Sequence, residues 1–468
     1  MPRKLIAATN VKTAVQQIVS YYLEDTDNAA PIYFDGWHGI GGASAVLRAI
    51  AEHPPPSLRE KFDKIIHIDC SRWKSRRALQ RVIADELKLT QQVAADFDRQ
   101  EEEDDFSGVD QGSRAEVAGV TRAINQSLVQ HRCLVLFNNG SDGLVNLTSS
   151  GIPQPEIFGT KVLWTFQGRL RRSIDSDEKV PRSHISIGEQ SGVPTNYTEI
   201  LAEEAREITL YTRKLGMGIT HEIATECCLY LVSLHDRGGD IDYNWAIHAS
   251  SYWVCDGIVR GGQDNQSWNL ARALQQQIRV EDYTPSTKSD YLASKLDIST
   301  KHWISVASSG FKEVPPGTTS LFVAPEKSTR STSSIISSLP SDMFLEADQL
   351  RVLKLCCCTF SFSSPPFHCC FNLRFLGLDS CVDEQQPGEE EKRTGGRALE
   401  TFQRLWVLDV SHTDWELDFP LETEQPVVAK ELREVHINKG RIWRRNLAWR
   451  RLPNLEKLRV VEPTRSWW

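Results

Sequence analysis

The chain has 468 residues, of which 40% are hydrophobic and 25% charged, and its 54 basic and 62 acidic side chains leave a formal net charge of −8. This composition is that of a globular protein with room for about three domains, and it excludes a fibrous chain, a disordered chain and a small disulfide scaffold. The acidic balance argues against a nucleic-acid partner, because phosphate backbones are gathered by basic surfaces.

The apolar pattern of the sequence and its cysteine usage both favour a cytoplasmic protein without a membrane partner. No apolar run reaches the roughly 18 residues that a membrane span requires, and the polar start Met1–Lys4 is followed by no apolar signal-peptide core. The 11 cysteines are odd in number and clumped, as at Cys356–Cys358, so we expect reduced, buried thiols rather than a disulfide framework. A zinc site among residues 356–381 is disfavoured because the C-x2-C spacing is missing.

Residues 31–185 are predicted to form an α/β domain with a largely parallel sheet. Before it, a short segment, residues 1–30, holds one amphipathic helix at 11–23 and leaves no room for a separate N-terminal domain. Short apolar runs then alternate with helical stretches such as that of Leu79, Val82, Ile83 and Leu87, which is the βαβ pattern. The acidic run Glu101–Asp105 is expected to be a solvated loop. The predicted strands are Ile32–Phe34, Ile65–Ile68, Cys133–Phe137 and Lys161–Thr165.

Residues 186–283 are predicted to be helical. Apolar side chains recur at helical spacing from 196 to 280, and the third helix, at 244–256, can be ended by Gly257. Residues 284–345 are rich in Ser, Thr, Pro and Lys and are expected to form a connector with some short strands.

The last segment, residues 346–468, repeats a leucine pattern. Two copies of L-x-x-L-x-L-x-x-C begin at Leu350 and Leu373, and weaker copies begin at Leu405, Leu432 and Leu455. Starts 23, 32, 27 and 23 residues apart are near the period of leucine-rich repeats, so we predict a short repeat solenoid. The cysteine after each strand is expected to satisfy the turn backbone. The basic, tryptophan-containing stretch Lys439–Arg451 is interpreted as a repeat connector, with a protein-binding surface as the alternative.

A glycine-rich turn after the first predicted strand is the candidate phosphate-binding site. A glycine-rich backbone between a strand and a helix, which has no side chains in the way, presents N–H groups and the positive end of the helix to an anion. The G-x-x-x-x-G-K-[ST] pattern is degenerate here, because it requires glycine, lysine and Ser/Thr where this chain has other residues. Magnesium and the outer phosphates therefore lose their usual contacts. The candidate ADP-binding residues are Gly39, Gly41, Gly42, Ser44, Ala45 and Val46.

Two interpretations of this turn stay open: weak ADP binding, or a tight turn without a ligand. Asp35 and His38 flank the turn and could act as an acid/base pair, but solvated loop residues are the commoner case. Ser44 suggests a hydrolase elbow, although Val46 replaces the second glycine of that motif.

The order of these motifs resembles the NB-ARC domain of plant nucleotide-binding leucine-rich-repeat disease-resistance proteins. The resemblance spans residues 31–468 and includes the glycine-rich turn, Phe62–Ile68, Leu134–Asn139 and Gly159–Thr165. Glu226–Leu231 and Tyr252–Ile258 resemble the winged-helix segment of that family. The resemblance implies a P-loop-like sheet domain, a helical and winged-helix region and leucine-rich repeats, although the chain is shorter than the family at both ends.

The departures from the family are systematic. The paired acidic residues that hold magnesium correspond to Asn138 and Asn139, and the arginine that senses the γ-phosphate falls at Gln167. His302 is at best a remnant of the Met-His-Asp motif that touches ADP. Each lost charge-assisted contact costs about 1.5–3 kcal/mol, so we expect no enzymatic ATP hydrolysis.

The resemblance predicts a defence-related protein that acts as a protein-interaction or sensor module with an eroded ADP/ATP site. Its expected partners are proteins that contact the repeats, including other receptors of the same family. The alternative is a working ADP/ATP-binding switch of the STAND type with unorthodox phosphate contacts.

Overall fold

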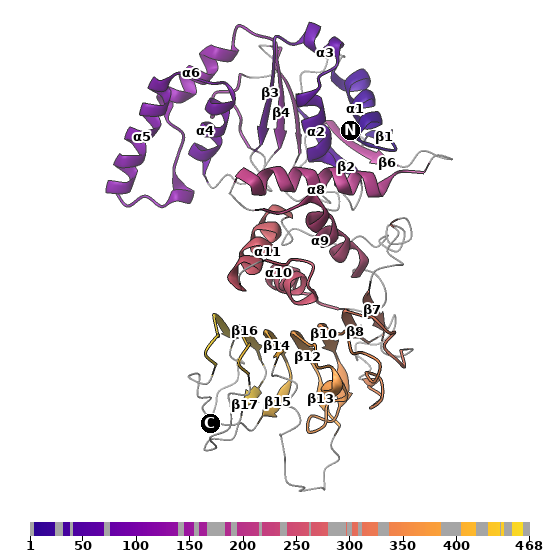
Figure 1. The fold of residues 1–468 in the computed structure, drawn as a ribbon. Helices are drawn as coiled ribbons and strands as arrows, with labels where there is room; N and C mark the ends of the chain where they lie inside the picture. Colours follow the sequence, from indigo (N-terminus) through magenta and orange to yellow (C-terminus); the bar gives the residue numbers. More distant parts are fainter. Residues whose placement is uncertain are drawn as a thin grey trace. The chain divides into compact units, whose positions relative to one another are not determined.

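The computed structural model describes most of the chain, and the described residues form two compact units (Figure 1). Unit 1 contains residues 1–225 and 276–286, and unit 2 contains residues 226–275 and 287–468. The finer domain boundaries given above stay predictions. The described residues are 4–23, 31–37, 41–69, 75–138, 145–153, 159–165, 183–188, 194–214, 218–234, 241–261, 264–278, 296, 302–307, 311–325, 337–384, 404–417, 429–439, 441–443 and 452–461.

Unit 1 is built on a six-stranded sheet in which every pairing is parallel. The strand order is β1-β6-β2-β5-β4-β3. The four predicted strands are confirmed, and two further strands, β1 and β6, extend the sheet at one edge. The strands are β1 (Lys4–Ala7), β2 (Ile32–Trp37), β3 (Lys64–Asp69), β4 (Cys133–Asn138), β5 (Lys161–Thr165) and β6 (Ser183–Gly188).

Helices cover both faces of this sheet, which gives an α/β arrangement compatible with a P-loop-like domain (Figure 1). Helices α1 and α2 lie on one face, α4 and α6 lie on the other, and α5 packs against α6. Val135 and Phe137 enter the core under α4 and α6, and the alternation of a strand sends Leu134 and Leu136 to the opposite face. The helices are α1 (Val11–Ile18, continued by a π-helical turn at Val19–Leu23), α2 (Ala43–Glu52), α3 (Pro56–Lys61), α4 (Arg76–Glu86), α5 (Gln91–Phe106), α6 (Ala118–Leu128) and α8 (Tyr197–Lys214).

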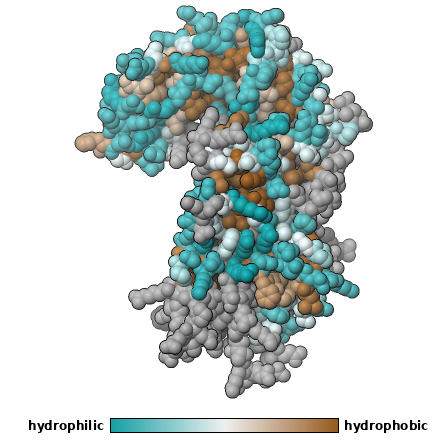
Figure 2. All heavy atoms as spheres, in the orientation of Figure 1, coloured by the Kyte–Doolittle hydropathy of each residue, from teal (hydrophilic) through white to brown (hydrophobic). Residues whose placement is uncertain are grey.

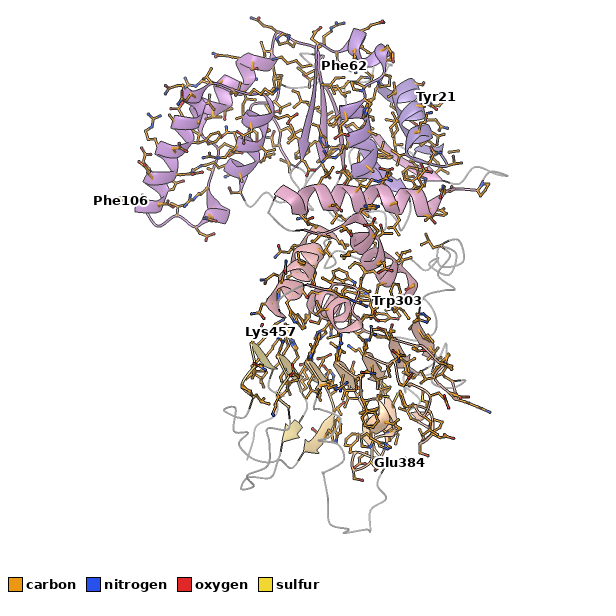
Figure 3. The ribbon with its side chains drawn as sticks, viewed as in Figure 1. Tyr21, Phe62, Phe106, Trp303, Glu384 and Lys457 are labelled. Atoms are coloured by element: carbon orange, nitrogen blue, oxygen red, sulfur yellow. The ribbon has the colours of Figure 1, made fainter. Side chains whose placement is uncertain are left out.

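The acidic run Glu101–Asp105 is helical, so its prediction as a loop was wrong. It forms the last turns of the 16-residue helix α5, which Val93 and Phe97 anchor by burial. The outer surface here is hydrophilic, and Phe106 marks the end of the helix (Figures 2 and 3). Neighbouring arginines offset the repulsion within the run: Arg77 pairs with Asp104, Arg81 with Glu101 and Arg114 with Asp105.

Unit 2 is built on a seven-stranded, wholly parallel sheet in the order β18-β16-β14-β12-β10-β8-β7. The five leucine patterns fall on five consecutive strands in register, since Leu353 pairs with Leu376, which pairs with Leu408. Two strands of the predicted connector, β7 and β8, extend this sheet. The strands are β7 (Trp303–Ala307), β8 (Ser320–Ala324), β10 (Val352–Cys356), β12 (Phe375–Asp379), β14 (Val407–Ser411), β16 (Glu434–Asn438) and β18 (Lys457–Val461).

Along the strands of the seven-stranded sheet, successive side chains point to opposite faces, and the two faces have different surroundings. The leucines point into a core that also holds Phe360 and Phe367, and the short strands β9 (Ser337–Ser338), β11 (Cys358–Phe360) and β13 (Val382–Asp383) form a second sheet. Cys358 Sγ donates to Cys356 O at 3.3 Å, and Cys381 Sγ donates to Leu355 O at 3.4 Å. Both acceptors belong to β10, so these two thiols contact the strand backbone where contacts with the turn backbone were expected. Strands β15 (Asp414–Leu417) and β17 (Arg441–Trp443) pair in the later repeats.

Helix α10 (Trp245–Asp256) packs on the other face of this sheet and contacts β10 and β12 (Figure 3). It ends as predicted, because Gly257 adopts the left-handed conformation at φ 94° and its N–H bonds to Trp253 O. Tyr252 and His248 of this helix meet Phe375 of the sheet. Helices α9 (His221–Leu234) and α11 (Asp264–Ile278) flank it in sequence. Over the described residues, no helix is long and apolar enough to cross a membrane.

Candidate functional site

The glycine-rich turn lies where an α/β sheet places its ligands. It follows β2, which lies between β6 on one side and β5 on the other. Both neighbours come later in the sequence than β2. Ligands of open α/β sheets bind beyond the carboxyl ends of the strands, at the point where the strand order reverses. Helix α8 crosses this end of the sheet and packs against α2 (Figure 1).

The turn closes on itself through backbone contacts. Trp37 N donates to Gly41 O at 2.6 Å, and Gly41 N donates back to Trp37 O at 3.0 Å. Gly36 has φ 74°, and a Cβ atom there would lie 2.1 Å from Gly41 O. Gly42 has φ 78°, and a Cβ atom there would lie 2.5 Å from Trp37 Cε3. Glycine is therefore required at both positions by steric contact and by conformation.

The structure describes five of the six predicted phosphate-loop residues. Gly39 lies outside the described residues, as does His38. Gly41 and Gly42 form the end of the turn, and the other three begin α2 with 9%, 6% and 0% of their surface exposed, in the order Ser44, Ala45 and Val46. The N–H of Val46 is used inside the helix, where it donates to Gly42 O at 3.1 Å. In its described part the turn leads from β2 into α2, and the first residues of that helix are buried.

A carboxylate of the protein itself occupies the N-terminus of α2. Ala45 N donates to Glu204 Oε1 at 3.3 Å, and Glu204, on α8, is only 1% exposed. A helix N-terminus carries a partial positive charge and free N–H groups, so it stabilises an anion that lies against it. Glu204 thus places a buried carboxylate against the N-terminus of α2.

The same edge of the sheet carries more negative than positive charge in its described part. Arg48 of α2 pairs with the buried Glu207 of α8 and lies 3.9 Å from Asp69 at the end of β3. Burial alone would lower the pKa of Arg48, but the charges and hydrogen bonds of Glu207, Asp69 and Glu52 raise it above its usual value. Three carboxylates, those of Glu207, Asp69 and Glu52, therefore share one guanidinium, and Glu204 adds a fourth carboxylate. Such a group repels a polyphosphate unless other cations enter the site.

Of the predicted counterparts of the family's magnesium- and phosphate-contacting residues, the structure describes Asn138. Asn138 ends β4, is 5% exposed and accepts a hydrogen bond of 3.5 Å from Ser44 Oγ. The Ser44 hydroxyl is thus held by an amide at the sheet edge. Asp35 accepts from Tyr33 OH at 3.3 Å. Asn139 and Gln167 lie outside the described residues, and so does most of Lys439–Arg451.

His302, the proposed remnant of the Met-His-Asp motif, is exposed in unit 2 beside β7. No known protein family and no curated protein sequence matches this chain. The resemblance to the plant resistance-protein family therefore stays a prediction from the order of the sequence motifs.

Sequence reasoning missed the contact between Glu204 and Ala45. These residues are 159 positions apart, and Glu204 stands in an ordinary amphipathic helix pattern next to Glu203. No local sequence signal distinguishes the buried Glu204 from the half-buried Glu203. Only the packing of α8 across α2 distinguishes them.

Proposed function

We propose that this chain is a disease-resistance-like protein of the NB-ARC leucine-rich-repeat type that works as a protein-interaction or sensor module with an eroded nucleotide site. The observation that carries the proposal is the Glu204 carboxylate on the Ala45 N–H. It stands where a phosphate would bind, in a turn that has Ala45 and Val46 in place of lysine and Ser/Thr.

The energetic comparison favours an empty nucleotide site. An incoming phosphate must displace or lie beside a buried carboxylate, and it gains no lysine charge in return. Each missing charge-assisted contact is worth about 1.5–3 kcal/mol, and the lysine, the magnesium ligand and the paired acidic residues are all replaced. Without differential contacts to ADP and ATP, the chain cannot be switched between two states by nucleotide.

The five in-register repeats support the interaction role. Each leucine pattern contributes one strand to a parallel sheet, which supports the proposal of a leucine-rich-repeat solenoid. A solenoid of this kind would offer an extended surface to protein partners. We infer that partners, including related receptors, contact this region.

Nucleotide content and affinity test the proposal. The purified full chain is extracted with acid, and the supernatant is analysed by chromatography for ADP and ATP. Isothermal titration calorimetry with ADP and Mg²⁺ follows, on the wild type and on Glu204→Gln. Glu203→Gln is the matched control, since Glu203 is a half-buried neighbour on α8 that pairs with Arg206.

We expect no stoichiometric nucleotide in the wild type and stronger ADP binding in E204Q than in E203Q, because E204Q removes the competing charge. One equivalent of bound nucleotide in the wild type would refute the eroded site and would establish the working switch.

A further inference from the structure

A cavity of about 450 Å³ lies within unit 2, between the end of α10, the start of α11 and the ends of strands where β10, β12, β14 and β16 begin. Its described lining includes one carboxylate, that of Glu431. The remaining charged side chains of the lining are arginines, and they are accompanied by two tryptophans: Arg260, Arg351, Arg374, Arg433, Trp268 and Trp406.

The repeat itself creates one wall of this cavity. In the first four patterns, the residue after the first leucine is Arg351, Arg374, Trp406 and then Arg433, and in the fifth pattern it is Glu456. Backbone hydrogen bonds of 2.8, 2.7 and 2.8 Å join the first four of these residues, each to the preceding one. Neighbouring strands lie about 4.8 Å apart, so the register holds three arginines and a tryptophan in one row.

Helix α10 supplies the opposite wall. Arg260 Nε donates to Gly257 O at 2.7 Å, and Arg351 NH1 donates to Asp256 O at 2.6 Å. A Cβ atom at Gly257 would come within 3.1 Å of Arg351 NH1, so glycine leaves room for this guanidinium. These contacts hold Arg260 and Arg351 at the carbonyl end of the helix, and each uses only one of the five N–H donors of its arginine.

Arg374 is the least compensated cation of the group. Its guanidinium stacks on the Trp406 ring at 4.4 Å, which fixes its plane. Within the described chain, no ion pair joins Arg260, Arg351 or Arg374 to a carboxylate, whereas Arg433 pairs with Glu456 at 3.2 Å. Burial lowers the pKa of Arg374, the nearby charges of Arg351 and Arg260 lower it further, and the charge of Asp256 acts in the opposite direction. An anion in the cavity would relieve this repulsion.

We infer that this cavity binds a small anion that carries at least two phosphoryl groups. Guanidinium groups bind phosphate through paired N–H donors, and three unpaired guanidiniums on two walls suit more than one phosphoryl group. The volume is that of a small-molecule pocket and is too small for a folded partner. This site lies in unit 2 and does not depend on the nucleotide site proposed for unit 1.

Calorimetric titration of the full chain with pyrophosphate tests the inference. Inorganic phosphate and citrate are titrated in parallel at one ionic strength, so that phosphoryl number and phosphate chemistry are compared without a change in screening. The variants are Arg374→Gln, Arg351→Gln and Arg260→Gln, and the last removes an exposed side chain with little risk to folding. Arg459→Gln removes an exposed arginine of β18 that does not line the cavity and serves as the matched control. Thermal unfolding of every variant checks the fold.

We expect one pyrophosphate per chain, weaker binding of single phosphate and of citrate, and a loss of about 10- to 100-fold in affinity for each cavity variant. R459Q should bind as the wild type does. The inference is overturned if pyrophosphate does not saturate, if citrate binds as tightly, or if R459Q weakens binding as much as R374Q. Pyrophosphate binding that all three cavity variants leave unchanged would place the anion elsewhere, and it would also overturn the inference.

Discussion

Substitution of Asp409 should destabilise unit 2 strongly, because this carboxylate neutralises a buried cation. Asp409 Oδ2 lies 3.6 Å from Lys354 Nζ and 3.3 Å from His248 Nε2. The side chains of Lys354 and Asp409 are 2% and 6% exposed. Asp409→Leu conserves the approximate volume of the side chain but leaves the ammonium of Lys354 without a counter-ion.

The expected loss is about 3–5 kcal/mol, the cost of removing one partner of a buried ion pair. For a unit of this size, 1 kcal/mol moves the unfolding midpoint by roughly 2–4 °C, so the midpoint should fall by roughly 6–20 °C. The double variant Asp409→Leu with Lys354→Met removes both charges and should recover most of the loss, because apolar replacements of buried pairs are often neutral or stabilising.

Thermal unfolding monitored by circular dichroism measures these changes, with urea unfolding as the second method. Asp342→Leu, at an exposed turn position, controls for the loss of an acidic residue. A loss in D409L no larger than in D342L would refute the ion-pair reasoning. A double variant less stable than both single variants would refute it as well.

Acidification should lower the unfolding midpoint in two stages. Burial lowers the pKa of His248 below 6.5, so stability falls as the pH drops below about 6.5, where the unfolded chain takes up the proton first. Burial alone would raise the pKa of Asp409, but His248 and Lys354 lower it from 3.8 to about 2, so further stability is lost between those values. A midpoint that is constant from pH 7 to pH 3 would contradict this. Gly42→Ala should lower the free energy of unfolding in urea by more than Gly108→Ala does. Both glycines have a positive φ, but of the two only Gly42 leaves no room for a Cβ atom. Equal losses in the two variants would exclude the steric clash at Gly42. Leu376→Ala should cost about 2–5 kcal/mol by the same measurement, and a loss below 1 kcal/mol would show that its buried site collapses without a cavity.

The sheet of unit 1 could be predicted because its strands are continuous apolar runs bounded by turns. Parallel strands are buried on both faces, so their runs stand out from the helices between them, and Lys161–Thr165 begins and ends as expected. Strand β1 is only four residues long, and its run gives no comparable signal. The acidic run at Glu101–Asp105 was assigned to a loop because charge density suggested solvation. The sequence-distant cations Arg77, Arg81 and Arg114 instead let the helix continue through it.

The candidate phosphate loop also combines features that the sequence predicts with one that it does not. Its glycines and its missing lysine are local facts, so the turn and its degenerate chemistry could both be predicted. Whether the N-terminus of α2 is free or occupied depends on Glu204, which is 159 positions away from Ala45 in the sequence.

The sequence by itself determined the strands of unit 1 that stand out as short apolar runs, and the strands of unit 2 that carry the leucine pattern. The leucine pattern is enough for the latter because its internal spacing puts the same side chains on one face of each strand, although the distance between copies varies. Only the tertiary structure decided which charges are buried and which are paired. The energy of a charge depends on its distance from other charges and from water, and segments far apart in the chain set those distances.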